Sequence, residues 1–75
     1  AHQSHWDSAF EEAARGCASG YDNASRTLQV LFDAYQLKQS SSEFKQNFDV
    51  FISKNKQRKA LIKRLEPLQK IMLSL

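Results

Sequence analysis

The stretch from Trp6 to Tyr21 reads WDSAFEEAARGCASGY, and its apolar residues recur at the spacing of an α-helix. They follow one another at steps of three, one, three, one, three, one and three positions, which places them on one side of a helix. The members of this row are Trp6, Ala9, Phe10, Ala13, Ala14, Cys17, Ala18 and Tyr21. The pattern predicts an amphipathic first helix over residues 5–19 whose apolar side, including Cys17, is buried.

Serine and glycine residues suggest where this first helix begins and ends. Ser4 can cap its first turn and brings Trp6 into the helix, while Ser8 with Glu11 has the capping-box spacing and is the alternative start. Gly16 falls on the polar side of the predicted helix, and Gly20 is a natural stop.

Two more helices follow with the same three-and-four spacing of apolar residues. A second helix is predicted over residues 23–38, capped by Asp22 or Asn23. Its apolar row is Ala24, Leu28, Leu31, Phe32 and Tyr35, widened by Val30, Ala34 and Leu37. A third helix is predicted over residues 42–53, where Ser40 and Glu43 have the capping-box spacing, and its inward side is Phe44, Phe48, Phe51 and Ile52.

Residues 53–57 contain no apolar side chain, and a helix running straight through them would turn Leu61 away from the row of the third helix. We therefore expect a turn near Asn55 and a fourth helix over residues 56–74. Its apolar row is Leu61, Leu65, Leu68, Met72 and Leu75, flanked by Ile62 and Ile71. Pro67 predicts a kink in this helix, because proline removes one backbone hydrogen bond and clashes with the preceding turn.

Four amphipathic helices with short connections predict an all-α protein, a small antiparallel three- to four-helix bundle forming a single domain over residues 1–75. A chain of 75 residues builds only a thin core. The single cysteine, Cys17, excludes an intrachain disulfide and favours a reducing, intracellular and cytoplasmic location. No apolar run is long enough to cross a bilayer, and residues 1–7 do not resemble a signal peptide.

Residues suited to catalysis are sparse. His2 and His5 lie three positions apart, but no third and fourth ligand accompany them, so a metal site is not expected. No glycine-rich phosphate loop, nucleophile elbow or Cys/His cluster occurs. We therefore expect no catalytic residues, no cofactor and no metal, and a protein that is not an enzyme.

Charge is distributed unevenly along the chain. Residues 1–40 contain three basic and five acidic side chains, a balance of −2, whereas residues 41–75 contain eight basic and three acidic ones, a balance of +5. Six of the cations fall in an eleven-residue window without an acid: Lys54, Lys56, Arg58, Lys59, Lys63 and Arg64. The simplest interpretation is a solvated face, and the functional one is a binding surface.

Three kinds of partner fit such a surface. The first is another protein, with the cations as the rim of a helix-docking face and Trp6 as an anchor if its ring is exposed. The second is an anionic membrane surface, because residues 54–70 form a basic amphipathic helix. The third is a nucleic acid, although the aromatic residues are spaced as a core and not for base stacking. A homo-oligomer is a further possibility.

Two resemblances to known families point the same way. Trp6-Asp7-Ser8-Ala9-Phe10, together with the stretch from Phe48 to Leu68 that ends in RLEPL, resembles the helical N-terminal region of fungal NLR-like (STAND) proteins. That resemblance implies a signalling module in front of a nucleotide-binding oligomerisation domain. Tyr21-Asp22-Asn23-Ala24 with Leu28, Leu31 and Tyr35 is similar to the second helix of the microtubule-interacting-and-trafficking (MIT) domain, a three-helix bundle. That similarity implies a groove that binds short helical tails.

The sequence thus predicts a non-enzymatic protein–protein interaction or signalling module, part of a larger intracellular protein, that docks a partner through a helical face. The alternative is a basic helix over residues 54–70 that binds anionic lipid or nucleic acid.

Overall fold

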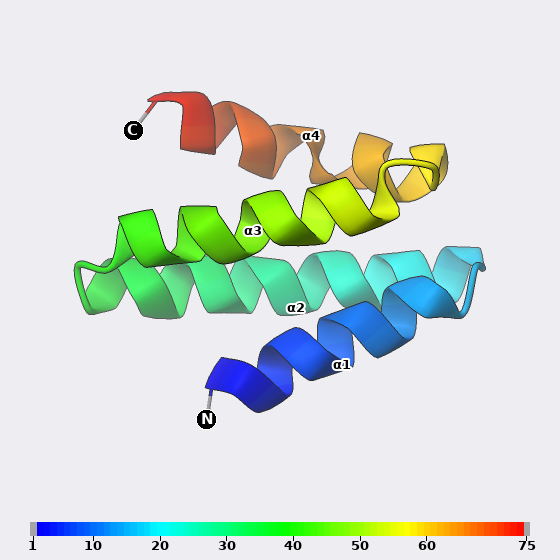
Figure 1. The fold of residues 1–75 in the computed structure, drawn as a ribbon, viewed down its shortest axis with the longest axis horizontal. Helices are drawn as coiled ribbons and strands as arrows, with labels where there is room; N and C mark the ends of the chain where they lie inside the picture. The colour runs from blue at the N-terminus through cyan, green and yellow to red at the C-terminus, as the bar shows by residue number, and fades with distance from the viewer. Residues whose placement is uncertain (1, 75) are drawn as a thin grey trace.

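The computed structural model describes the backbone of residues 2–74 and the side chains of residues 3–74. Four helices are present: α1 (His2–Ala14), α2 (Ala18–Leu37), α3 (Ser41–Asn55) and α4 (Lys59–Ser74). Residues 2–74 contain no strand, so the predicted all-α bundle is confirmed. Successive helices run in opposite directions (Figure 1), and α2 packs against each of the other three.

The first helix ends earlier than predicted, at Ala14 instead of residue 19. Gly16 has a φ of +68°, a left-handed conformation that glycine adopts without steric cost and that ends a helix. Before it, the amides of Arg15 and Gly16 donate to the carbonyls of Glu12 and Ala13, both over 3.2 Å. The predicted apolar row is therefore interrupted: Trp6, Ala9 and Ala13 are buried, but Ala14, Cys17 and Ala18 are exposed. The prediction of a buried Cys17 was wrong.

Gly20 was predicted to end the first helix, but it lies buried inside α2. A Cβ atom at this position would overlap the carbonyl oxygen of Glu12 on α1. The absence of a side chain therefore lets α1 and α2 approach closely, as do the fully buried Ala9 and Ala13. The prediction that Asp22 or Asn23 caps the second helix was also wrong, because both residues lie within α2.

The other helix starts differ in part from prediction. α1 begins at His2, so Ser4 and Ser8 lie inside it and neither is the residue at which it starts. Ser40 does occupy the N-cap position of α3, but its hydroxyl makes no capping bond and donates to the carbonyl of Lys38 over 3.4 Å. The amides of Glu43 and Phe44 instead donate to the Ser40 carbonyl, so backbone contacts begin this helix.

The connection between α3 and α4 confirms the turn expected near Asn55. α3 ends at the buried Asn55, and α4 begins at Lys59, three residues later than predicted. α4 then continues through Pro67 to Ser74 as one helix, so the proline does not end the helix. The row Leu61, Leu65, Leu68 and Met72 stays buried on both sides of Pro67, while Leu75 lies outside the described residues.

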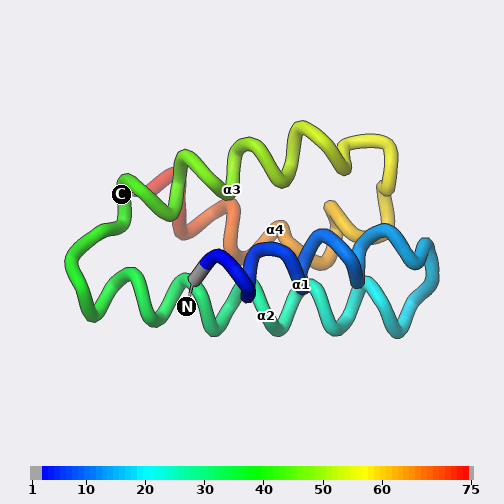
Figure 2. The backbone as a smooth tube through the Cα atoms, turned by 60° about the horizontal axis from the view of Figure 1, so that its bottom comes forward, coloured from blue at the N-terminus to red at the C-terminus, as the bar shows by residue number. Residues whose placement is uncertain are grey.

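The core is rich in aromatic side chains centred on Phe44 of α3. Its ring centroid lies 5.5 Å from Trp6, 5.3 Å from Phe32, 5.7 Å from Tyr35 and 5.5 Å from Phe48. The Trp6 indole N–H donates to the Tyr35 hydroxyl over 3.3 Å, which satisfies this buried donor. Figure 2 shows α1 lying along α2.

Some residues of the predicted apolar rows are exposed. Val30 and Leu37 were predicted to widen the row of α2, but they are 58% and 88% exposed. Ile71, predicted to flank the row of α4, is also exposed.

Candidate functional site

Two connections between helices lie at the same end of the bundle. In Figure 1 the α1–α2 and α3–α4 connections are both at the right. Arg58, in the α3–α4 connection, lies close to Gly16 in the α1–α2 connection. Its Nη1 atom is 3.6 Å from the position that a Cβ atom on Gly16 would take. This end carries the cations that the sequence singled out.

Asn55 fixes the shape of the α3–α4 connection and the position of Arg58. Its side-chain amide donates to the Phe51 carbonyl over 2.9 Å, and its Oδ1 accepts from Arg58 Nε over 3.2 Å. The Arg58 amide also donates to the Asn55 carbonyl over 2.9 Å. The half-buried Arg58 is therefore part of the structure of the turn and is only in part available to a partner.

The other arginines near this end are held in ion pairs within the chain. Arg64 Nε donates to Asp22 Oδ1 over 2.7 Å, and its guanidinium lies 5.8 Å from the centre of the Tyr21 ring. Arg15 Nη1 donates to Glu12 Oε2 over 2.8 Å. This hydrogen bond lowers the pKa of the Glu12 carboxyl and raises that of Arg15. These pairs tie α4 to α2 and close the C-terminal turn of α1.

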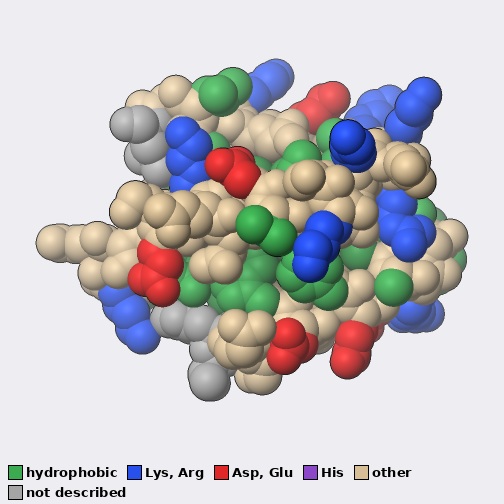
Figure 3. All heavy atoms as spheres, viewed as in Figure 1, with side chains coloured by type: hydrophobic (Ala, Val, Ile, Leu, Met, Phe, Trp, Pro, Cys, Tyr) green, Lys and Arg blue, Asp and Glu red, His purple; other side chains and the backbone are tan. Residues whose placement is uncertain are grey.

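Four lysines complete the site: Lys54, Lys56, Lys59 and Lys63, which we call the basic end. The Lys54 ammonium lies 5.5 Å from the centre of the Phe10 ring. All four side chains are exposed, and none forms an ion pair with another residue of the described chain. The space-filling view in Figure 3 shows Lys and Arg side chains gathered towards the right-hand end of the molecule.

The predicted site residues therefore separate into three groups. Lys54, Lys56, Lys59 and Lys63 are exposed and lie at the end of α3, in the α3–α4 connection and in the first turns of α4, while Arg58 and Arg64 are engaged in structural contacts. Trp6 is only 4% exposed and lies in the aromatic core, so its ring cannot anchor a partner in this structure. Its role is to close the core between α1 and α3.

Two features suited to chemistry or binding lie outside the predicted set. Cys17 is exposed before the first turn of α2, where a hydrogen bond with the Ser19 hydroxyl lowers the pKa of its thiol. Two adjoining hollows of about 320 and 270 Å³ lie between α3 and α4. Among the described residues, no group of three His, Cys, Asp or Glu side chains could hold a metal ion.

Comparison with known proteins finds no match to the chain among family models, curated proteins or solved structures. The resemblances to fungal NLR-like proteins and to the MIT domain thus remain predictions. No helix in the described part of the chain has the length and apolar character to cross a membrane.

Proposed function

We propose that this chain is a non-enzymatic protein-interaction module whose basic end docks an acidic segment of a partner protein. The observation that carries the proposal is the exposure of Lys54, Lys56, Lys59 and Lys63 around the α3–α4 connection, while Glu12 and Asp22 are already paired with arginines of the chain. Four exposed ammonium groups without an ion-pair partner among the described residues favour a ligand that supplies carboxylates.

A protein ligand fits this surface better than an anionic membrane does. The membrane alternative requires the apolar side of α4, but Leu61, Leu65 and Leu68 are buried in the bundle. Lipid binding through that side would need α4 to leave its place against α2 and α3, at the cost of much of a thin core. Of the exposed large apolar side chains, Leu37, Ile71 and Leu73 belong to the last residues of α2 and α4, away from the basic end, while Val30 and Val50 lie within α2 and α3.

A nucleic acid is also less well matched. Binding of single strands commonly uses exposed aromatic rings on which bases stack. The aromatic rings near the basic end are Phe10 and Tyr21, which are half-buried and lie beneath Lys54 and Arg64 respectively. Only electrostatic contact with phosphates is then left, which gives little discrimination between polyanions.

The test is an amide NMR titration of the whole chain with three separate probes. These are a short peptide of glutamate and leucine, vesicles containing phosphatidylserine, and a short DNA duplex. We expect the peptide to shift the amides of residues 54–64 and to lose affinity as salt is added, because salt screens exposed charges. A response to vesicles or DNA alone, with a steep loss in salt, would overturn the proposal in favour of a phosphate-binding surface.

A variant with Lys59→Glu and Lys63→Glu should lose peptide binding while keeping a dispersed helical spectrum. The matched control is Lys38→Glu with Lys70→Glu, which changes the net charge equally at positions outside the basic end. Equal loss of binding in both double variants would show that overall charge, and not this surface, attracts the peptide. The broader expectations, a signalling role within a larger intracellular protein, belong to the same proposal.

A further inference from the structure

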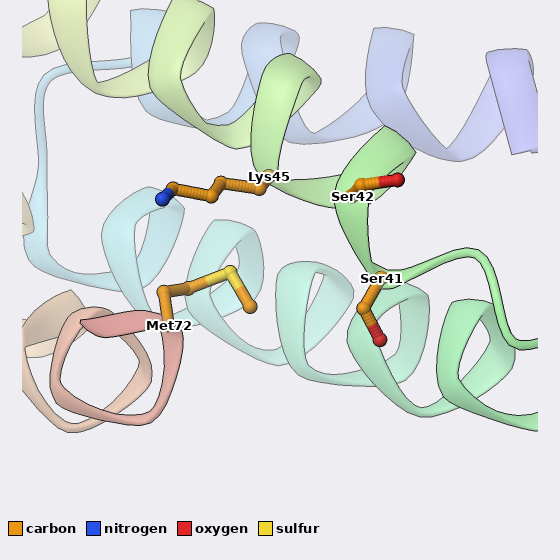
Figure 4. Close-up of a pocket in the computed structure, with 4 residues that line it drawn as sticks. All are labelled: Ser41, Ser42, Lys45 and Met72. Atoms are coloured by element: carbon orange, nitrogen blue, oxygen red, sulfur yellow. The ribbon is translucent and has the colours of Figure 1, made fainter. Parts of the chain in front are cut away.

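The hollows between α3 and α4 form one continuous groove, because Lys45 and Met72 line both. Ser41 and Ser42 complete the first hollow (Figure 4), and the second is completed by Phe48, Asp49, Ile52, Gln69 and Leu73. Figure 4 shows Lys45 extending from α3 on the side of the groove facing Met72 of α4. Phe48, Ile52 and Met72 make the floor apolar, since these side chains pack with or belong to the core.

Leu73 stands at the rim of this groove and is 84% exposed. It directly follows the buried Met72, so the α4 side of the groove offers a large apolar side chain to solvent. The exposed leucine and the apolar floor together give the groove an apolar surface that a second protein surface can cover.

The charges on the α3 side of the groove indicate what covers it. Lys45 and Asp49 are exposed, carry opposite charges and lie one helical turn apart, about 6 Å along the axis. Neither is ion-paired with a described residue, and a lysine preceding an aspartate is the less favourable order for a pair within one helix. Both side chains are thus available for an external partner.

This arrangement is complementary to itself. If a second copy of the chain packs on the groove with its α3 antiparallel, a two-fold axis passes between Lys45 and Asp49. Lys45 of each copy then faces Asp49 of the other, giving two equivalent ion pairs. The same rotation brings Leu73 of each copy towards the apolar floor around Phe48 and Ile52 of the other.

We propose that the α3–α4 groove is a two-fold interface between two copies of this chain. The proposal is independent of the basic end, whose lysines lie in the last turn of α3, the α3–α4 connection and the first turns of α4, because none of them lines the groove. A dimer of this kind leaves both basic ends exposed, so two acidic segments on one partner could be bound together.

The first test is the molar mass of the whole chain in solution, measured by analytical ultracentrifugation over a range of concentrations. We expect a reversible monomer–dimer equilibrium. Lys45→Glu makes the α3 side of the groove wholly acidic and Asp49→Lys makes it wholly basic, so each variant alone should dimerise about tenfold more weakly or worse. A chain that stays monomeric at every concentration would overturn the proposal.

The decisive measurement mixes these two variants. An acidic groove and a basic groove attract each other, so an equimolar mixture of Lys45→Glu and Asp49→Lys should form heterodimers although neither variant self-associates. An effect confined to one chain, such as altered helix stability, cannot produce this gain. Absence of heterodimers from the mixture would contradict the antiparallel pairing.

Leu73→Ser provides an independent variant with a matched control. Because Leu73 is already 84% exposed, the substitution should leave the melting temperature nearly unchanged and weaken dimerisation. Leu37→Ser removes a leucine that is 88% exposed but lies outside the groove, at the end of α2, and should have no effect on association. Equal effects of the two substitutions would show that unspecific apolar contact, and not the groove, drives association.

Discussion

One residue, Gly16, determines the environment of its neighbour Cys17. The left-handed backbone at Gly16 ends α1, so Cys17 becomes the N-cap residue of α2 and its thiol is exposed. In an uninterrupted helix the same thiol would lie on the buried side. The difference between an inert and an accessible cysteine is therefore set by one backbone angle.

The accessible thiol of Cys17 leads to a pH-dependent prediction. Its pKa is lowered mainly by the hydrogen bond with the Ser19 hydroxyl and by the Gly20 amide. Because a lower pKa gives thiolate at lower pH, the rate of alkylation by iodoacetamide should reach its half-maximum at a lower pH in the folded chain than in urea. Ser19→Ala should move this midpoint upwards. Identical midpoints for the variant and the parent chain would contradict the role of Ser19.

At the scale of helices, the rows of apolar residues were predictable and the ends of the helices were only partly so. Leu28, Phe44 and Leu65 are buried as predicted because a period near 3.6 residues identifies one side of a helix. Helix ends depend on finer interactions: Gly20 reads as a stop, yet it is needed inside α2 for contact with α1. Ser40 lies at a helix start without making the side-chain bond that its spacing suggested.

Pro67 offers a test of how much α4 depends on local helix geometry. It is exposed, lies inside α4 and leaves the carbonyl of Lys63 without its helical donor. Pro67→Ala should restore that hydrogen bond and raise the free energy of unfolding by roughly 1–3 kcal/mol. Urea denaturation would measure the change.

Lys70→Ala is the control, because it is an exposed substitution in the same helix that should change stability by only a few tenths of a kcal/mol. A loss of stability in Pro67→Ala would mean that α4 requires the distorted backbone to place Leu65 and Leu68 together in the core.

At the scale of the whole molecule, the candidate sites show what a linear pattern can and cannot predict. The basic run was visible in the sequence, but which cations are available was not, since Arg64 is paired with Asp22, 42 residues away. No pattern in the sequence indicated the α3–α4 groove. Lys45 and Asp49 had the pattern of solvent-facing residues, and their relation to Leu73 depends on how α4 folds back over α3.

The lysines of the basic end also destabilise the fold. Lys59 and Lys63 are like charges one turn apart, and Lys59 lies at the N-terminus of α4, where the helix dipole disfavours a cation. Lys59→Glu should therefore raise the free energy of unfolding by about 0.5–1 kcal/mol while it weakens binding of the acidic peptide. Lys38→Glu makes the same change in charge at the C-cap of α2, where a cation is favourable, and should lower stability. Thermal unfolding at low salt would measure both. If Lys59→Glu proved destabilising, the lysines would be part of what holds the bundle together, and their interpretation as a surface kept for a partner would fail.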